Sequence, residues 1–346
     1  MKTALNLAAL AAITTIASAQ AQSVADFYKA NRLTIYVGSS AGGGTDIYGR
    51  RVAQFIGKHL PGNPGTIVKN LPGANGLVLA NQLATVLPKD GTAVGTFDRN
   101  AAMHSIWGNP KAKFDATQLN WIGSANVDIS TCVTLHTSGI DTLDKFMGRE
   151  VMLGATAVYH ANILNALFGA KLKQVTGYRG GNGVLLALER GEVQGRCNWS
   201  WSSIAATRPD WVKQKKINVI IQFADKKHPE LPNVPLIGEL VKTDKQRQML
   251  DLILSSQVMA RPFAAPPGVP AERVTALRAA FMALEKDPAF IKSAKAQDLE
   301  FEPVSGDKIQ SIIARIAKTP KPLIRELRDV ALGPEASAAM DKGGRK

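Results

Sequence analysis

A run of small residues between positions 38 and 46 is the part of this chain whose residue types could do chemistry. It reads Gly-Ser-Ser-Ala-Gly-Gly-Gly-Thr-Asp and directly follows the β-branched and aromatic residues 33–37. Phosphate binding in a P-loop and dinucleotide binding both use glycine-rich segments of this kind. The P-loop pattern fails because Gly44 stands at the position of its lysine, and the dinucleotide pattern fails because Ile47 stands at the position of its last glycine.

Nucleophilic catalysis is the third chemistry that this segment suggests. The spacing Gly38-x-Ser40-x-Gly42 matches the nucleophile elbow of α/β-hydrolases, which would make Ser40 the nucleophile of an esterase. In α/β-hydrolases the elbow follows a strand in the interior of the sheet, and a loop after an earlier strand supplies the oxyanion hole. Here only one predicted strand precedes Ser40. The esterase therefore stays an alternative that the chain order disfavours.

Anion binding by the main chain is the interpretation that remains. Thr45 and Asp46 can each cap a helix, and apolar residues then recur at helical spacing until Pro61. Small residues at the start of a helix leave backbone N–H groups open and aligned with the positive end of the helix dipole. The segment predicts an anion site without a side-chain cation, with Asp46 as a cap rather than a catalytic acid.

Strand and helix patterns alternate along the chain, which is typical of parallel sheets covered by helices. Short β-branched runs at residues 66–68 and 93–97 flank a helical pattern at 77–86. The alternation starts again near Cys132. Strands are expected there at residues 131–135, 150–153, 173–176 and 193–197, and helices at 142–147, 160–168 and 184–190. After residue 266 we expect three helices and no strand, with the helices at residues 271–286, 307–318 and 322–330.

Length, charge and the N-terminal residues narrow the class of protein. A chain of 346 residues is long enough for two domains with separate cores. Its formal net charge of +14 favours an anionic partner without choosing among nucleic acid, anionic lipid and small acids. Residues 1–21 combine Lys2, an apolar run and small-residue cleavage patterns, which predicts an export signal peptide rather than a short N-terminal helix. Export argues against a nucleic-acid partner.

Two cysteines, Cys132 and Cys197, are present in the whole chain. An exported chain with an even cysteine count can pair them, and both follow β-rich segments that could form neighbouring strands. A disulfide is slightly favoured over two buried free thiols, and the sequence leaves the choice open.

The remaining chemistry-bearing residues give weaker signals. The five histidines show no metal-ligand spacing, so we expect no metal and no cofactor. Trp199, in the segment Asn198-Trp199-Ser200-Trp201, could stack on a flat ligand or pack in the core. Nothing in the sequence decides between these two roles.

Six short motifs together carry a family resemblance. They are Ala-Gly-Gly-Gly-Thr-Asp at 41–46, Asn-Leu-Pro-Gly-Ala-Asn-Gly at 70–76, Pro-Lys-Asp-Gly-Thr at 88–92, Tyr-Arg-Gly-Gly at 178–181, Gly-Glu-Val at 191–193 and Leu-Pro-Asn-Val-Pro at 231–235. In this order and at this spacing they resemble the signature of the Bug-type solute receptors of tripartite tricarboxylate transporters. The resemblance runs from about residue 33 to residue 325.

The resemblance implies a type II periplasmic-binding-protein fold, in which two α/β lobes joined by crossing strands surround a ligand cleft. The first lobe is expected at residues 22–127 plus 258–346 and the second at 128–257. It also implies a periplasmic monomer, not an enzyme, that captures a small organic carboxylate and delivers it to the membrane permease subunits of a tripartite tricarboxylate transporter. A ligand sensor that feeds a signalling system is the alternative within the same fold.

The resemblance also implies the ligand-binding residues. The first lobe would contribute Ser39, Ser40, Ala41, Gly43, Gly44, Thr45 and Asp46, and the second lobe Thr156, Ala157, Tyr178, Arg179, Gly180 and Trp199. Arg179 is expected to bind a second carboxylate, and Tyr178 to add its hydroxyl or its ring. The chain departs from the family at Ser39-Ser40, where Pro-Phe is usual, and at Gln194, where an acid is usual. Both departures touch the expected cleft, so the ligand cannot be taken over from one relative.

Overall fold

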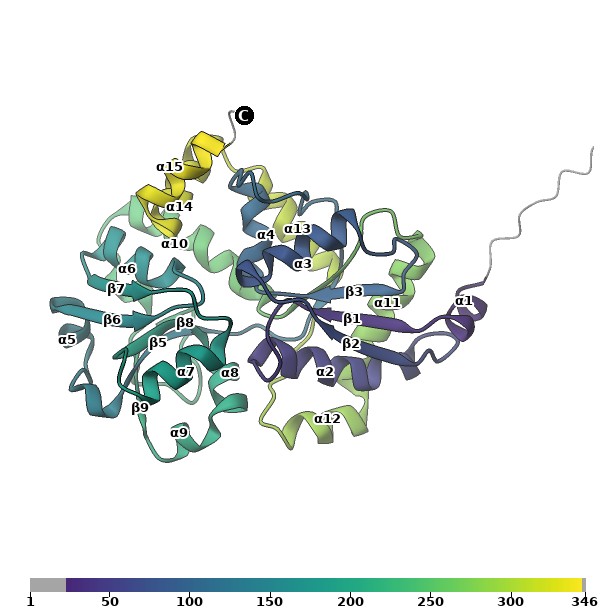
Figure 1. Cartoon of the computed structure of the whole chain (residues 1–346), viewed down its shortest axis with the longest axis horizontal. Helices are drawn as coiled ribbons and strands as arrows, with labels where there is room; N and C mark the ends of the chain where they lie inside the picture. The colour runs from purple at the N-terminus through teal and green to yellow at the C-terminus, as the bar shows by residue number, and fades with distance from the viewer. Residues whose placement is uncertain (1–22, 344–346) are drawn as a thin grey trace, which may run out of the picture.

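Two β-sheets, each covered by helices, divide the chain into two lobes (Figure 1). The structure is a computed structural model that describes residues 23–343, so the expected signal peptide at residues 1–21 lies outside the described residues. No helix within residues 23–343 is both long enough and apolar enough to cross a lipid bilayer. Two α/β lobes are what the sequence predicted.

The first sheet has the strand order β11-β4-β10-β3-β1-β2. Its strands are β1 (Leu33–Val37), β2 (Thr66–Asn70), β3 (Ala93–Thr96), β4 (Asn120–Ser124), β10 (Pro262–Ala265) and β11 (Val304–Ser305). The expected parallel pairing holds between β1 and its neighbours β2 and β3, but β10 is antiparallel to β3 and β4. The sheet is mixed because β10 enters it after the chain has returned from the second lobe.

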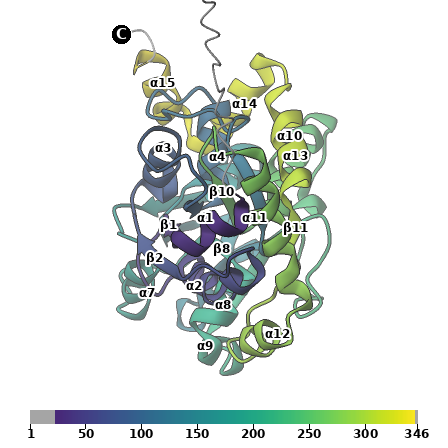
Figure 2. The same cartoon turned by 90° about the vertical axis from the view of Figure 1, so that its right-hand side faces the viewer.

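Helices from both ends of the chain cover the first sheet. They are α1 (Val24–Ala30), α2 (Gly44–Ile56), α3 (Leu77–Thr85), α4 (Arg99–Ile106), α11 (Ala271–Ala283), α12 (Pro288–Lys295) and α13 (Gly306–Ala317). In β1, Leu33, Ile35 and Val37 alternate inward and share one core with Val52 and Ile56 of α2. Helix α1 lies beside α11, so a helix formed before the chain crosses to the second lobe packs against one formed after its return (Figure 2).

The second sheet has the strand order β7-β6-β8-β5-β9. Its strands are β5 (Ser130–Leu135), β6 (Glu150–Gly154), β7 (Lys171–Val175), β8 (Gly195–Ser200) and β9 (Ile217–Phe223), and its helices are α5 (Leu143–Gly148), α6 (Tyr159–Phe168), α7 (Gly181–Glu189), α8 (Trp201–Thr207), α9 (Pro209–Lys213) and α10 (Asp244–Ser255). This sheet is also mixed, since β6 is parallel to β7 and β8 while β5 is antiparallel to β8 and β9.

Two crossings join the lobes. The chain leaves the first lobe between β4 and β5 and returns through α10 and the short helix η5 (Ser256–Met259) to β10. The crossings lie side by side, because the Ala125 amide donates to the Arg261 carbonyl at 3.0 Å. Five further short 3₁₀ helices complete the described chain, at Gly57–His59, Ala74–Gly76, His136–Ser138, Ile237–Leu240 and Leu284–Lys286.

The C-terminal helix α14 (Lys321–Leu332) contacts both lobes, and α15 (Pro334–Gly343) packs on α14. Helix α14 packs on α6, and Asn162 Nδ2 donates to the Ala331 carbonyl at 3.0 Å. The guanidinium of Arg328 reaches the Trp107 carbonyl beyond α4 at 3.4 Å. The expected first lobe included residues 258–346, yet α14 from this range packs on α6 of the second lobe.

The disulfide between Cys132 and Cys197 is formed. It joins β5 to β8, two neighbouring strands, as the sequence slightly favoured. The two cysteines are 65 residues apart in sequence, and closing a loop of this size stabilises a fold by about 4 kcal/mol in the chain-entropy model.

Candidate ligand-binding cleft

A cleft of about 350 Å³ lies between the lobes, with walls from both. Ten of the thirteen residues expected at the site line it: Ser39, Ser40, Gly43, Gly44, Thr45, Thr156, Tyr178, Arg179, Gly180 and Trp199. Ala41, Asp46 and Ala157 do not. The sequence therefore located both faces of the cleft but assigned three side chains to it that point or lie elsewhere.

The glycine loop after β1 forms the wall of the first lobe. Gly42 has a φ of +79°, which favours glycine, and α2 begins at Gly44 with Gly43 as its N-cap. The first N–H groups of a helix have no acceptor within the helix, and here they carry the positive end of the α2 dipole. Since Gly44 and Thr45 line the cleft, these donors lie where a carboxylate can reach them.

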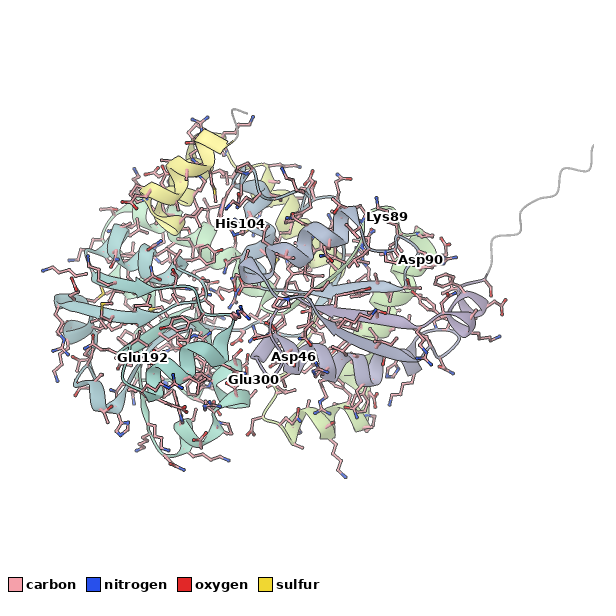
Figure 3. The ribbon with its side chains drawn as sticks, in the orientation of Figure 1. Asp46, Lys89, Asp90, His104, Glu192 and Glu300 are labelled. Atoms are coloured by element: carbon pink, nitrogen blue, oxygen red, sulfur yellow. A yellow bond between two sulfur atoms is a disulfide. The ribbon has the colours of Figure 1, made fainter. Side chains whose placement is uncertain are left out.

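Asp46 fixes the conformation of this loop through hydrogen bonds. Its Oδ2 accepts from the Gly42 amide at 2.8 Å and pairs with Arg50 Nε at 2.8 Å, and its Oδ1 accepts from Asn70 Nδ2 at 2.7 Å. Burial acts to raise the pKa of Asp46, but the hydrogen bonds from Arg50, Gly42 and Asn70 outweigh it, so the pKa lies below its ordinary value. Figure 3 shows Asp46 on the part of α2 next to the other lobe. With both oxygens engaged inside the lobe, Asp46 holds the loop instead of the ligand.

The loop after β2 is a part of the site that the sequence analysis used only for recognition. Asn70 Nδ2 also donates to the Ser39 carbonyl at 3.0 Å, which ties this loop to the glycine loop. Pro72, Gly73 and Ala74 then line the cleft. The Asn-Leu-Pro-Gly motif was a sufficient signal for these residues, because it follows the strand next to β1 and parallel strands place such loops at one edge of the sheet.

The second lobe closes over the glycine loop through its own loop before α7. A Cβ placed on Gly180 would lie 2.2 Å from Ser40 Oγ, so only a glycine permits this approach. Asn182 Nδ2 donates to the Ala41 carbonyl at 3.4 Å. Ala41 therefore makes a contact between the lobes and stands outside the cleft lining, and Ala157 is buried at 7% exposure.

Arg196 in β8 is the main residue that the sequence analysis missed. Its side chain lines the cleft and the residue is 6% exposed. Within the described chain it makes no ion pair or hydrogen bond, and its buried Nε has no acceptor. Burial lowers the pKa of Arg196 to about 10, which still leaves it charged at neutral pH. The sequence analysis expected a side-chain cation in the second lobe only at Arg179, and the cleft lining adds Arg196 to it.

Trp199 supports Arg196 and is otherwise packed. The guanidinium carbon of Arg196 lies 4.7 Å from the centre of a Trp199 ring, and Trp211 packs edge-on against the same indole at 6.3 Å. Trp199 is only 4% exposed. Of the two roles that the sequence left open, the geometry favours packing.

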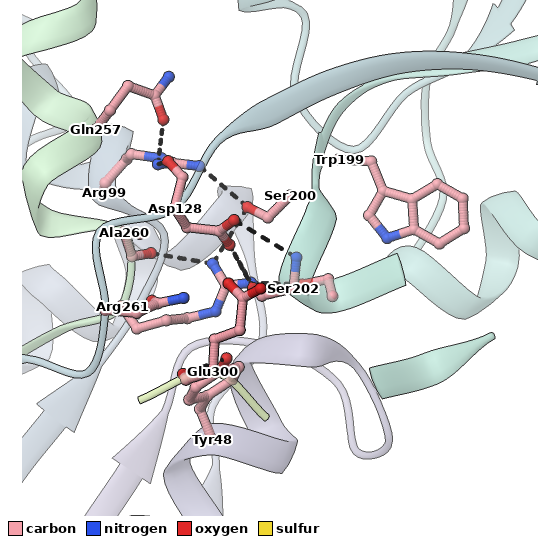
Figure 4. A network of polar contacts seen from close by, with 12 residues as sticks. Tyr48, Arg99, Asp128, Trp199, Ser200, Ser202, Gln257, Ala260, Arg261 and Glu300 are labelled. Carbon is pink, nitrogen blue, oxygen red and sulfur yellow. Dashed lines mark hydrogen bonds and ion pairs between the residues drawn. The ribbon is translucent and has the colours of Figure 1, made fainter. Parts of the chain in front are cut away.

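A buried polar network lies at the floor of the cleft, where the crossings meet (Figure 4). Arg261, which lines the cleft, donates to Ser200 Oγ at 3.4 Å and to Ser202 Oγ at 3.2 Å, and pairs with Asp128 at 3.5 Å. Arg99 of α4 donates to the same Ser200 hydroxyl at 3.1 Å and to Gln257. The two arginines thus share the Ser200 hydroxyl, and Arg261 is the one that pairs with the Asp128 carboxylate.

Comparison with known proteins agrees with this architecture. No family model matches the chain. A protein of Cupriavidus necator, the UPF0065 protein in gbd 5'region, is 25% identical over 336 residues, which span 93% of this chain and 95% of that protein. The periplasmic binding protein BugD superposes with a TM-score of 0.66 at 17% identity, with 86% of this chain and 97% of BugD covered. The chain has the fold of BugD.

A second solved structure of this fold is R. palustris Rpa4515 with adipate, at a TM-score of 0.65 and 18% identity, with 87% of this chain and 97% of Rpa4515 covered. These likenesses bear out the two-lobed fold and the resemblance to Bug-type receptors that the six motifs indicated.

The esterase alternative finds no support in the residues that line this cleft. Ser40 lines it, but the lining residues include no histidine that could act as a base. Elsewhere in the described chain His59 pairs with Asp287 at 2.9 Å and His104 contacts the Tyr159 hydroxyl at 3.0 Å. The Ser40 hydroxyl instead faces Gly180 of the other lobe.

One group of side chains outside the cleft has metal-ligand types that the sequence spacing did not suggest. Atoms of His228, Glu230 and Glu300 lie within 4.8 Å of one another. His228 Nε2 contacts Glu300 Oε1 at 3.0 Å, and Glu230 accepts from Trp201 Nε1 at 2.6 Å. These contacts give each member of the group a partner, and the His228–Glu300 pair joins the two lobes.

Proposed function

We propose that this chain is a periplasmic solute-binding receptor that captures a small organic carboxylate between its lobes and delivers it to the permease subunits of a tripartite tricarboxylate-type transporter. The observation that carries the proposal is that the open amides at the start of α2 and the unpaired Arg196 line the same cleft. The receptor acts as a monomer and binds without a cofactor. Its carboxylate chemistry is that of Rpa4515, the relative solved with adipate.

The first lobe binds one carboxylate through the main chain. Charged hydrogen bonds contribute about 1.5 to 3 kcal/mol each, so three donors around Gly44 supply about 5 to 9 kcal/mol, while association costs at least about 4 kcal/mol. Micromolar binding needs about −8 kcal/mol. The first lobe alone is too weak, and the second lobe must add contacts.

Closure makes those contacts and also carries the signal to the permease. The close approach of Gly180 to Ser40 and the bond from Asn182 to Ala41 exist only when the lobes are together. A ligand that binds both walls favours this closed form over the open one. The permease then recognises a surface to which both lobes contribute, so that it engages loaded receptors.

A binding panel tests this function. The purified mature chain is titrated by calorimetry with acetate, butyrate, succinate, malate, adipate, citrate and benzoate, and its melting temperature is followed with each. We expect micromolar or tighter binding of at least one acid and a rise of its melting temperature. Ester turnover that is lost in Ser40→Ala would instead establish the hydrolase, and absence of binding to every acid would refute the receptor.

A further inference from the structure

Arg196 is a buried cation that has no anionic partner among the described residues. The residue is 6% exposed, and burial is the sole cause that shifts its pKa. Among the cleft residues Asp98 is the one acid, and its carboxylate caps α4 by accepting from the Asn100 amide at 2.8 Å. Burying a guanidinium without a partner costs several kcal/mol, so a fold that keeps Arg196 has a use for its charge.

A bulge in β8 aims Arg196 at the cleft. Residues three apart in a regular strand point to opposite faces, yet Arg196 and Trp199 contact each other. The pairing of β8 with β5 shifts register between Thr131 and Val133, and Asn198 has a φ of +56°. Between the pairs formed by Thr131 and Val133, β8 has one residue more than β5, which makes a bulge. The bulge turns the indole toward the guanidinium, so strand periodicity alone gave no signal for the contact between Arg196 and Trp199.

The indole also fixes the plane of the guanidinium. With one face on Trp199, Arg196 has its edge left for binding, and a Cβ placed on Gly181 would lie 3.3 Å from its Nη1. A guanidinium edge matches a carboxylate through two parallel hydrogen bonds, a geometry that lysine cannot reproduce. The glycine at the start of α7 leaves this edge uncovered.

We propose that Arg196 is the specificity-determining residue of the cleft and binds a second carboxylate of the ligand. This inference rests on the proposed function, in which the first carboxylate lies on the α2 amides of the other lobe. Three arginines line the cleft, and Arg261 pairs with Asp128, which leaves Arg179 and Arg196 to face a ligand with two negative charges. The receptor therefore selects dicarboxylates over monocarboxylates of the same length, and Trp199 acts as the positioning residue.

The test compares two ligand series on matched variants. Wild type, Arg196→Met, Arg196→Lys and Arg190→Met are titrated with succinate, glutarate and adipate and with butyrate, valerate and hexanoate. A charged hydrogen-bonded pair corresponds to about 10- to 150-fold in affinity, so wild type should prefer the best dicarboxylate by a factor in this range. Arg196→Met should abolish the preference while keeping monocarboxylate binding. Arg196→Lys should keep a part of it. Arg190→Met, which removes an exposed arginine outside the cleft lining, should leave it unchanged.

Ligand-free stability gives a second readout that does not depend on the panel. If only a bound ligand compensates the charge of Arg196, then Arg196→Met removes an unpaired buried charge. This substitution should raise the melting temperature of the ligand-free receptor. A fall in melting temperature would show a structural role and overturn the proposal, as would dicarboxylate binding that Arg196→Met leaves unchanged. Absence of binding by wild type to both series and to every acid of the first panel would refute the proposed function, while the ligand-free melting temperature would still test the role of Arg196.

Discussion

Replacing Gly44 by alanine tests whether binding requires the lobes to meet. A Cβ at this position would lie 2.1 Å from Ser203 Oγ and 2.8 Å from Ser203 Cβ, across the boundary between α2 and α8. Gly44 is the first residue of α2 and its φ is not in the left-handed region, so alanine suits the local backbone. The variant should fold normally and resist closing.

The size of the effect follows from the overlap. Forcing one extra methyl group into a packed contact costs about 1 to 3 kcal/mol. Because that cost falls on the closed form, ligand affinity should fall by about 5- to 140-fold. Calorimetry measures the loss, and small-angle scattering of the ligand-loaded variant should show a more open shape than loaded wild type.

Matched variants separate closure from other effects of the methyl group. Gly148→Ala places a methyl group where nothing lies within 4 Å and should leave affinity unchanged. Ser203→Gly removes the clashing atoms, after which the nearest atom, Ser203 Cα, is 3.4 Å away. The double variant should therefore bind better than Gly44→Ala alone, once the effect of Ser203→Gly by itself is subtracted. Full affinity in Gly44→Ala would refute the link between closure and binding.

Two further predictions concern covalent and ionic links. Removing the disulfide in Cys132→Ser/Cys197→Ser should lower the free energy of unfolding by about 2 to 4 kcal/mol in denaturant titrations. Between the lobes, burial acts to lower the pKa of His228, but Glu300, with Glu230 and Asp128, raises it above 6.5. The charged pair between His228 and Glu300 stabilises the closed form below pH 6.5 and is lost as the pH rises through the raised pKa of His228. The ligand affinity of wild type should therefore fall as the pH rises from 6.5 through this pKa. The affinity of His228→Gln should stay constant over the same pH range.

Local signals were sufficient for the first lobe's half of the site. Strand β1 was predicted at its observed bounds because its β-branched and aromatic residues are followed at once by a glycine run. The same run indicated the loop, but the predicted caps Thr45 and Asp46 were wrong, because both lie inside α2 and its N-cap is Gly43. What these signals could not give is the direction of each side chain, and Asp46 shows why: its partner Asn70 lies 24 residues away.

The second lobe was harder because its geometry depends on pairing between distant strands. The strand expected at residues 193–197 lies instead at Gly195–Ser200, since the bulge opposite β5 extends the pairing to Ser200. Strand β11 has two residues and carries no periodic pattern at all. Helix α8, which supplies Ser203 and Ser202, begins at Trp201 inside a segment that the sequence indicated only as aromatic.

The two walls of the cleft recognise a ligand by different means. The wall around Gly44 offers backbone amides, which donate hydrogen bonds to any carboxylate. These donors are part of the main chain, so side-chain substitutions change them little. The wall around Arg196 offers a side chain, which one substitution can remove or replace. A shared fold can therefore keep its general affinity for acids in one lobe while the other lobe sets which acid fits. The affinity of Arg196→Met for monocarboxylates measures the first contribution, and its lost preference for dicarboxylates measures the second.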